Sequence, residues 1–376
     1  MNVLVYYAPF GGGHKAASKI LLEIASQCKA NNLQLKEFDI TQNTGIVTSL
    51  ISLFYRGVAT KYTRLWAITF YLTQNRLVIN VLQLLLAIKL IPGITDALKK
   101  HKPDLIITTY FIGWFLKHAS KLMGSNIKII TLVTDPFDVH PVWINSSSDM
   151  YIFESQKAFA EGCKLGLSES TARIISPLVK SQFSRIPKAA NITKYKESFD
   201  LQNNYRTILL VGGAEGLKDG DRIMIELIKR YQNVNIVVVC GKNQVYREKC
   251  DSIKASYFAT NVLVIGYSTQ MYELMSIADL VITKAGPGII FEAVSLRKPI
   301  LVSSYLWRQE LGVKEYIVEN SLGYYTPDIS QLLQKVDLVL SNQHERQKIQ
   351  SAYSDLNFQP GNKQMEAILE DLSTDY

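Results

Sequence analysis

The chain has 376 residues, of which 47% are hydrophobic; this excludes a disordered protein and allows two domains with separate cores. The formal net charge of +8 and the pI near 9.0 favour an acidic partner, such as an anionic lipid, a nucleotide or a nucleic acid. The four cysteines lack metal-ligand spacing, which indicates reduced thiols in a cytoplasmic protein and argues against a zinc site.

The N-terminal segment is predicted to be a strand at residues 3–8, a glycine turn and a helix over about 16–30. It lacks the basic start and long apolar centre of a secretion signal. Gly12 and Gly13 precede the helix and form a turn suited to binding an anion. His14 lies at the helix start, where the helix dipole should lower its pKa slightly and keep it neutral at pH 7. It could then accept a proton from a hydroxyl group, although a histidine that merely caps the helix is the simpler alternative for a single residue.

Residues 40–95 contain no acid, but they contain five basic residues among aromatic and aliphatic neighbours. The uncharged runs at 65–75 and 77–88 are each too short to span a bilayer, which needs about 20 apolar residues. The pattern favours helices lying in an anionic membrane surface over a pair of core helices. The residues that we expect to contact the membrane are Arg56, Lys61, Arg64, Trp66 and Arg76.

Further strands are predicted in the first half at residues 104–109, 127–133, 150–153 and 174–175. Polar and aromatic residues follow the second of these, at the carboxyl end where open α/β sheets bind ligands. Asp135 and His140 in this segment are candidates for contact with an acceptor, and the sequence leaves open whether they lie close enough to act as an acid–base pair. Residues 177–204 are interpreted as the interdomain connection.

The second half alternates helices with aliphatic strands at residues 207–211, 235–240, 262–265, 280–283 and 299–302. This alternation predicts a parallel sheet covered on both faces.

A glycine turn follows the fourth strand of the second half. Gly286 and Gly288 leave backbone amides bare before a helix, which suits a phosphate. Glu292, one turn into that helix, is placed to accept hydrogen bonds from two ribose hydroxyls. Taken alone, the glycine pattern is better explained as an ordinary strand–helix connection, with Glu292 as a solvated charge. The D-x-D motif at Asp219 and Asp221 is interpreted as helix capping rather than metal binding.

Five motifs in order carry a family resemblance across residues 1 to about 325. They are Gly11-Gly12-Gly13-His14, the segment from Thr134-Asp135 to His140-Pro141-Val142-Trp143, Gly212-Gly213-Ala214-Glu215-Gly216, Gly266-Tyr267-Ser268-Thr269-Gln270-Met271, and the segment from Ile282-Thr283-Lys284 to Gln309-Glu310. In these motifs the chain resembles the monogalactosyldiacylglycerol synthases and the bacterial processive diacylglycerol glucosyltransferases, relatives of the peptidoglycan GlcNAc transferase.

The resemblance implies an α/β GT-B fold, with two Rossmann-like domains whose parallel sheets face a central cleft. An N-terminal domain at 1–185 would bind the acceptor and the membrane, and a C-terminal domain at 205–350 would bind the UDP-sugar. A C-terminal helix over about 361–376 is expected to pack back on the first domain.

The resemblance also implies roles for individual residues. His14 would be the catalytic base. The acceptor would be contacted by Gly12, Gly13, Asp135, His140 and Trp143. The donor would be bound by Gly212, Gly213, Tyr267, Ser268, Gly286, Gly288, Glu292, Gln309 and Glu310. Such an enzyme needs no metal ion or other cofactor besides its UDP-sugar co-substrate, because helix dipoles and amides carry the charge of the leaving diphosphate.

The expected function is therefore inverting transfer of a hexose from a UDP-sugar to a membrane lipid, with diacylglycerol as the favoured acceptor. We expect the protein to act peripherally at the cytoplasmic face of a membrane. Residues 296–299 and 311–313 depart from the family beside the sugar pocket, which leaves galactose, glucose and N-acetylglucosamine open. The alternatives are a UDP-sugar 2-epimerase and a non-catalytic nucleotide-sugar-binding membrane protein. No nucleic-acid-binding module is recognised, and the sequence does not assign an oligomeric state.

Overall fold

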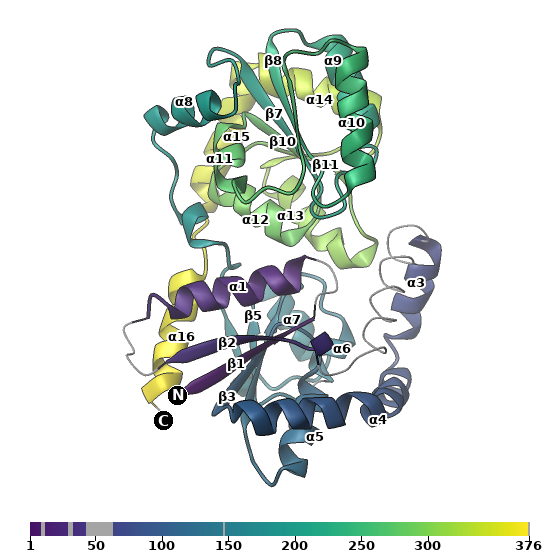
Figure 1. Ribbon diagram of the computed structural model, residues 1–376, viewed down its shortest axis with the longest axis vertical. Coiled ribbons are helices and arrows are strands. Elements are labelled where there is room, and N and C mark those ends of the chain that lie inside the picture. The colour runs from purple at the N-terminus through teal and green to yellow at the C-terminus, as the bar shows by residue number, and fades with distance from the viewer. Residues whose placement is uncertain (9–11, 29–32, 43–62, 146, 375–376) are drawn as a thin grey trace. The chain divides into compact units, whose positions relative to one another are not determined.

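The computed structural model describes residues 1–8, 12–28, 33–42, 63–145 and 147–374, and the chain divides into two compact units (Figure 1). The first unit comprises Met1–Ser181, Leu306–Gln309 and Pro360–Tyr376, and the second comprises Gln182–Tyr305 and Glu310–Gln359. Each unit contains a six-stranded sheet in which every strand pairing is parallel. The predicted α/β architecture with two parallel sheets is therefore confirmed.

The first sheet has the strand order β2-β1-β3-β4-β5-β6. Its strands are β1 (Asn2–Tyr7), β2 (Gln34–Asp39), β3 (Leu105–Thr108), β4 (Lys128–Val133), β5 (Met150–Phe153) and β6 (Ala172–Ile174). The central strands are almost completely buried, whereas the edge strand β2 alternates between exposed and partly buried residues. A continuous aliphatic run predicts a parallel strand that is buried on both faces. The sequence of β2 has no such run.

The helices of the first unit are α1 (Gly13–Ala25), α3 (Thr63–Leu72), α4 (Arg76–His101), α5 (Gly113–Leu122), α6 (Pro141–Ile144), α7 (Gln156–Lys164) and α16 (Asn362–Thr374). Helices α1 and α16 pack on one face of the sheet, and α4 and α5 pack on the other. Alternate side chains of β1 enter different cores: Val3 and Val5 pack with α1 and α16, whereas Leu4 and Tyr6 pack with α4 and α5. The C-terminal helix α16 lies against α1, so both ends of the chain belong to the first unit.

The second sheet has the strand order β12-β11-β10-β7-β8-β9. Its strands are β7 (Arg206–Val211), β8 (Val234–Val239), β9 (Val262–Ile265), β10 (Leu280–Lys284), β11 (Ile300–Ser304) and β12 (Gly323–Tyr325). The accompanying helices are α8 (Ala189–Ser198), α9 (Gly220–Arg230), α10 (Gln244–Ser256), α11 (Met271–Ile277), α12 (Pro287–Ser295), α13 (Leu311–Glu319), α14 (Ile329–Ser341) and α15 (Gln343–Leu356).

The interpretation of residues 177–204 as a plain connection was incomplete, because α8 lies within this segment. Most side chains of α8 are exposed, so its sequence shows little apolar periodicity. Lys196 is its one buried residue, and the Lys196 ammonium donates to the Tyr205 carbonyl at 2.6 Å. The helix packs against α11 in the second unit.

Candidate functional site

In the first unit, four strands end side by side at one edge of the sheet, in the order β1, β3, β4, β5. The segments that follow them carry the predicted acceptor-side residues. Because all four strands are parallel, their carboxyl ends gather polar groups that are far apart in the sequence.

His14 lies in the first turn of α1, which begins at Gly13 rather than at the predicted residue 16. Its Nδ1 lies 2.7 Å from the Thr109 carbonyl oxygen and 3.1 Å from the Thr134 hydroxyl. Since a carbonyl oxygen can only accept, Nδ1 carries the proton in the neutral ring, and Nε2 keeps the lone pair. The ring is therefore oriented with Nε2 as the basic atom.

Burial lowers the pKa of His14 to about 4, and the hydrogen bond to the Thr109 carbonyl opposes this shift. The sequence predicts the direction of the shift correctly, but it attributes the shift to the helix dipole, whereas burial is the main cause. The imidazole is neutral at pH 7, which is the state that can take a proton.

Aromatic rings surround His14. The Tyr110 ring meets the imidazole edge-on with a centroid distance of 4.9 Å, and the Trp143 ring lies at 6.0 Å. The Trp143 side chain is buried, and its Nε1 donates to Asp135 Oδ2 at 2.7 Å. Asp135 and Trp143, both predicted for the acceptor side, are thus brought together close to His14.

His140 has a different environment from the one expected of an acceptor ligand. It caps α6, where its Nδ1 accepts from the Val142 N–H at 3.2 Å. Its Nε2 lies 3.3 Å from the Phe70 carbonyl oxygen and 3.3 Å from the Thr73 hydroxyl. Burial lowers the pKa of His140. Nδ1 is used to cap α6 and Nε2 contacts the end of α3, so the geometry favours a structural role for this side chain.

Gly12 and Gly13 are exposed at the start of α1, with no atom near the position that a Cβ would take. Gly12 is the N-cap residue of the helix, and no side chain caps it. The first amides of α1 therefore keep the positive potential of a helix start, as the anion-binding prediction requires.

Glu154, directly after β5, was not identified from the sequence. The residue is only 7% exposed, and its Oε1 accepts from the Leu178 N–H at 2.8 Å. Burial raises the pKa of Glu154 from 4.5 to about 7; the Leu178 hydrogen bond lowers it, and the charge of Asp135 raises it further. A carboxyl group that titrates near neutral pH thus lies next to the acceptor-side residues.

In the second unit, the turn after β7 has a conformation that requires glycine. A Cβ on Gly212 would lie 2.1 Å from the Gly216 carbonyl oxygen, and Gly213 has a φ of +86°. The backbone therefore folds tightly at the carboxyl end of the strand, where the family resemblance predicts the donor diphosphate.

The start of α12 provides a second amide-rich turn. Gly286 is its N-cap without a capping side chain, and Pro287, the first helical residue, has no N–H group. A Cβ on Gly288 would meet no atom within 4 Å, so space is open above this turn. Glu292 follows in the same helix and is 8% exposed. Glu310 is buried as well, and it forms an ion pair with Lys284 at the end of β10.

The remaining predicted donor residues lie in two loops. Tyr267 and Ser268 follow β9; the Tyr267 ring is 65% exposed, and the Lys242 ammonium lies 5.4 Å from its centroid. Gln309 lies in the short 3-10 helix Arg308–Glu310, which follows β11.

Asp219 and Asp221 do not act as the predicted pair of helix caps. Asp219 occupies the N-cap position of α9, but its backbone is left-handed and its side chain makes no capping hydrogen bond. Asp221 forms an ion pair with Lys249 instead.

The predicted membrane residues are only partly described. Arg56 and Lys61 lie outside the described residues, as do the side chains of Arg64 and Trp66. Arg76 is exposed at the start of α4, where it donates to the Leu165 carbonyl.

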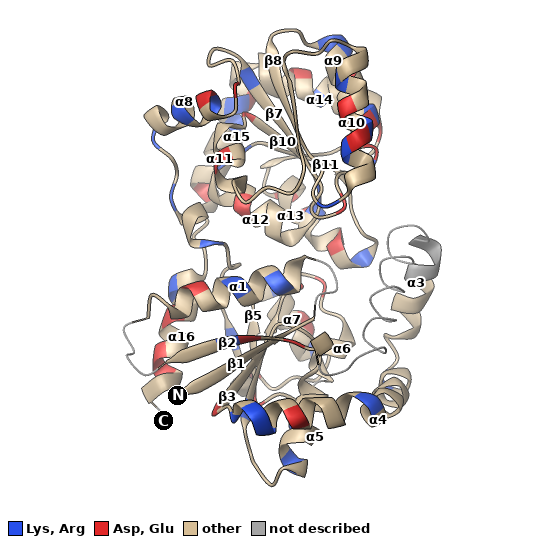
Figure 2. Cartoon of the chain, viewed as in Figure 1, with Lys and Arg blue, Asp and Glu red and all other residues tan. Residues whose placement is uncertain are grey.

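The second uncharged run, residues 77–88, is part of the longer helix α4. Among the described helices, this 26-residue helix is long and apolar enough to cross a membrane. Its second half, however, packs in the core of the first unit through Leu90, Ile94 and Leu98. The first half carries exposed apolar side chains, and it appears largely uncharged in Figure 2.

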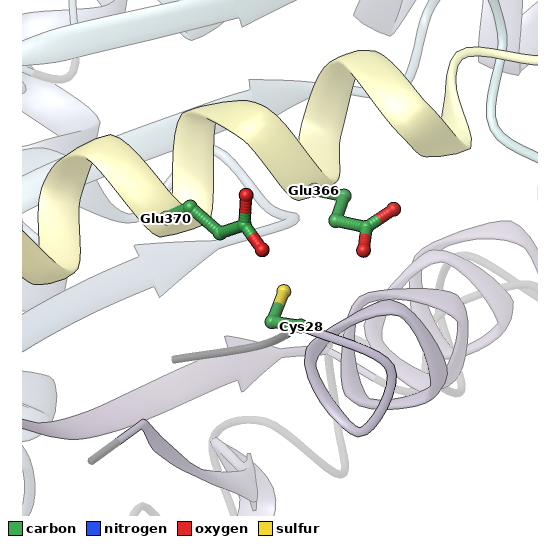
Figure 3. A group of neighbouring side chains, drawn as sticks. All are labelled: Cys28, Glu366 and Glu370. Carbon is green, nitrogen blue, oxygen red and sulfur yellow. The ribbon is translucent and has the colours of Figure 1, made fainter. Parts of the chain in front are cut away.

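Among the described residues, one group could offer three ligand atoms to a metal ion: Cys28, Glu366 and Glu370. Figure 3 shows the two carboxylates of α16 pointing toward the thiol. Cys28 lies beyond the C-terminal end of α1, about 20 Å along the helix axis from His14 at its start. This group is therefore separate from the acceptor-side residues.

Four residues at the two sheet edges were missed as site residues by sequence reasoning: Thr109, Thr134, Glu154 and Lys284. Each ends a strand or lies within one residue of its carboxyl end. Their position directly at the carboxyl end of a predicted strand could have identified them, since parallel sheets bind ligands at this edge.

Comparison with known proteins finds similarity for both halves of the chain. Residues 14–178 match the model of the monogalactosyldiacylglycerol synthase family, and residues 207–347 match the glycosyltransferase family 28 C-terminal domain. Monogalactosyldiacylglycerol synthase 2 of Arabidopsis thaliana is 26% identical over 86% of this chain and 70% of its own length. Synthase 1 of the same plant is 27% identical over 86% of this chain and 62% of its own length.

Solved structures of similar fold cover both units. The UDP-GlcNAc 2-epimerase of Neisseria meningitidis has a TM-score of 0.62 at 14% identity, covering 99% of each chain. HepE of Anabaena, solved with UDP and glucose, has a TM-score of 0.61 at 13% identity and covers 100% of each chain. MurG of Acinetobacter baumannii has a TM-score of 0.60 at 13% identity, covering 99% of this chain and 100% of its own. These likenesses show the GT-B fold, and the two matched models and the curated relatives show that the chain is similar to the monogalactosyldiacylglycerol synthases over most of its length.

Proposed function

We propose that the protein transfers a hexose from a UDP-sugar to a membrane lipid, with diacylglycerol as the acceptor and inversion at the anomeric carbon. The observation that carries the proposal is the placement of His14, a neutral imidazole fixed through Nδ1 among acceptor-side residues of a glycosyltransferase. The names of the relatives, which are monogalactosyldiacylglycerol synthases, support the lipid acceptor.

In the proposed reaction, His14 Nε2 removes the proton from the acceptor hydroxyl as its oxygen attacks the anomeric carbon. The Thr109 carbonyl holds the ring in the required tautomer, and it also stabilises the imidazolium that forms. The partly exposed Tyr110 gives the acceptor an apolar contact beside His14, which suits a glycerolipid better than a free sugar. Trp143 is buried, so it would support His14 from behind rather than touch the acceptor. Asp135 fixes the Trp143 indole through its hydrogen bond.

The donor would bind to the second unit. In this proposal the backbone amides near Gly212, Gly213, Gly286 and Gly288 hold the diphosphate, and Glu292 accepts hydrogen bonds from the ribose. Helix-start amides can stabilise the charge that develops on the leaving UDP without a metal ion. Backbone groups at Tyr267 and Ser268 would hold the uracil, and Gln309 and Glu310 would contact the hexose.

The proposed membrane contact is an apolar surface on α3 and α4. We define the α3–α4 surface by side chains that are 56–74% exposed: Ile68, Tyr71, Leu72, Leu77, Val81, Leu84, Leu85 and Ile88. The five residues of α4 follow the spacing i, i+4, i+7, i+8, i+11, so they share one helix face. Water-exposed aliphatic groups of this number favour insertion into a lipid interface.

The basic residues of the same region would add attraction to anionic lipid. Because the second half of α4 packs in the protein core, the proposed attachment is peripheral rather than spanning. We place it at the cytoplasmic face of the membrane, which agrees with four cysteines that are all free.

A UDP-sugar 2-epimerase is the second candidate, because such an enzyme shares the fold. An epimerase acts on a soluble nucleotide-sugar and has no use for the α3–α4 surface, which favours the transferase. A non-catalytic nucleotide-sugar-binding protein would not need the fixed tautomer of His14.

The test is incubation of the protein with UDP-galactose, UDP-glucose or UDP-N-acetylglucosamine and vesicles containing diacylglycerol and anionic phospholipid. We expect one donor to give a hexosylated lipid, detected by product mass. Interconversion of UDP-N-acetylglucosamine with its 2-epimer, without any lipid product, would instead identify an epimerase.

A further inference from the structure

The short helix α6 contacts both the candidate base and the two helices that form the α3–α4 surface. Within α6, the Trp143 ring lies 6.0 Å from the His14 ring, and the Trp143 Nε1 donates to Asp135 Oδ2 at 2.7 Å. The residues that flank the helix, His140 and Asn145, contact α3 and α4 instead. One turn of helix therefore joins the proposed membrane contact to the site of proton transfer.

His140 connects α6 to the C-terminal end of α3. Since its Nδ1 accepts from the Val142 N–H, Nε2 carries the proton of the neutral ring and donates to the Phe70 carbonyl at 3.3 Å. The Phe70 ring also meets the imidazole edge-on, with a centroid distance of 4.7 Å. In the sequence Phe70 lies between Ile68 and Tyr71, which belong to the α3–α4 surface, so a displacement of that surface would act directly on His140.

Asn145 connects the other end of α6 to α4. Its Nδ2 donates to Asn80 Oδ1 at 2.9 Å and to Gln83 Oε1 at 2.8 Å, so both amide hydrogens are used. Asn80 and Gln83 are three residues apart and share one side of α4. Val81 and Leu84, which directly follow them, belong to the α3–α4 surface. The helix that would insert into lipid is therefore hydrogen-bonded to α6.

This contact between α4 and α6 is not fully satisfied. Gln83 is buried, with 5% of its surface exposed, and its Nε2 has no hydrogen-bond partner among the described residues. A buried donor without an acceptor costs free energy, so a small displacement of α4 that brings Nε2 to an acceptor would be favourable. Insertion of α4 into a lipid surface would supply such a displacement.

We propose that α6 transmits membrane docking to the base, with His140 and Asn145 as positioning residues. Docking of the α3–α4 surface fixes both ends of α6, and Trp143, held between them, then sets the His14 ring for proton transfer. The protein is therefore more active when it lies on lipid, even toward an acceptor that is dissolved in water. This inference rests on the proposed function, because it takes His14 as the base and the α3–α4 surface as the membrane contact.

The test measures transfer from the UDP-hexose that the protein uses to dihexanoylglycerol, a short-chain acceptor kept below its solubility limit. Turnover is compared with and without vesicles of anionic phospholipid that contain no diacylglycerol, and vesicle binding is followed by sedimentation. The wild type should show a several-fold increase in kcat when vesicles are added. The KM for the UDP-hexose should be nearly unchanged, since the proposed donor residues do not contact α6.

Asn145→Ala should bind the vesicles like the wild type but lose most of this increase, because α6 is no longer bound to α4. Removing both of its partners, in Asn80→Ala with Gln83→Ala, should cause the same loss. Combining all three substitutions should add little, as expected for residues that act through one contact. A side chain that only stabilises the fold would instead lower kcat equally with and without vesicles.

Asn320→Ala is the matched control. Asn320 is a partly buried asparagine of the second unit, and its Nδ2 donates to the Tyr316 carbonyl at 2.8 Å. This variant should keep the full increase in kcat.

Equal kcat of the wild type with and without bound vesicles, or a full increase in Asn145→Ala, would overturn this inference and leave the proposed function intact. If Asn145→Ala does not fold, Asn80→Ala with Gln83→Ala decides in the same way from the α4 side. Absence of a hexosylated product from the wild type, with dihexanoylglycerol and with bilayer diacylglycerol alike, would overturn the proposed function together with this inference.

Discussion

The carbonyl oxygen of Thr109 lies 2.7 Å from Nδ1 of His14, so a main-chain group that cannot move independently determines which ring nitrogen is basic. Thr109 follows β3 directly, and its N–H donates to the Tyr6 carbonyl of β1. The tautomer of His14 is thereby tied to the central strands of the sheet.

This relationship predicts the pH dependence of the reaction. Because burial lowers the pKa of His14 to about 4, the imidazole should be predominantly neutral above about pH 5. As pH falls below about 4, kcat/KM should drop about tenfold per pH unit if His14 is the only group titrating there. A profile that instead falls below about pH 6.5 would show that the ring titrates like an exposed histidine.

Glu154 predicts a change of stability with pH. Its pKa is raised to about 7 in the folded protein from an ordinary 4.5, so the folded state binds more protons between these values. The contribution of Glu154 to the free energy of unfolding should therefore be full below pH 4.5 and decrease as pH rises through about 7, by about 3 kcal/mol in total.

Glu154→Gln mimics the protonated acid and should remove this contribution. Chemical denaturation of the wild type and Glu154→Gln at pH 5 and pH 8 measures the difference. Equal pH dependence in both proteins would contradict the assignment.

Glu292 predicts a specific effect on nucleotide affinity. If the Glu292 carboxylate accepts hydrogen bonds from the ribose hydroxyls, Glu292→Ala should lower the affinity for UDP by roughly tenfold. This is the usual scale for hydrogen bonds to a charged group. The wild type should also prefer UDP to 2′-deoxy-UDP, and the variant should lose that preference. Glu226→Ala on the surface of α9 is the control. Retention of the preference in Glu292→Ala would place the ribose elsewhere.

The α3–α4 surface predicts membrane binding that resists salt. Replacing Leu77, Leu84 and Ile88 with Gln should weaken binding to vesicles by about 1.5 kcal/mol or more per side chain if each is fully inserted. The loss should persist at high ionic strength, because salt screens charges but not apolar burial.

Val245→Gln provides the control for that experiment, since Val245 is an equally exposed apolar residue in the second unit. If vesicle binding is lost at high salt but is unchanged by the three substitutions, the attachment depends on the basic residues alone.

Much of the fold could be predicted from the sequence because the central strands are continuous aliphatic runs. Residues 150–153 and 262–265 were predicted with the bounds that the structure gives them. The edge strand β2 was missed because its sequence is QLKEFD, in which alternate residues face solvent, whereas the edge strand β9 is an aliphatic run and was predicted. The helix α8 was missed because its stability depends on packing against α11 rather than on a periodic apolar face of its own.

The candidate site was harder to predict, because its contacts join residues that are distant in the sequence. Glycine turns and His14 were visible as motifs, yet the bond between His14 and Thr109 spans 95 positions. His140 lies in the same motif as Trp143, but the fold uses it to join α6 to α3. Burial, which lowers the pKa of His14 and raises that of Glu154, is a property of the folded chain alone.

The most direct measurement is the mass of the lipid product formed by the wild type and His14→Ala from a UDP-hexose and vesicles containing diacylglycerol. The account predicts a hexosylated diacylglycerol with the wild type and about 100-fold or greater loss of turnover in His14→Ala, with UDP affinity nearly intact. Absence of a lipid product with every UDP-hexose, or equal turnover in the two proteins, would contradict it.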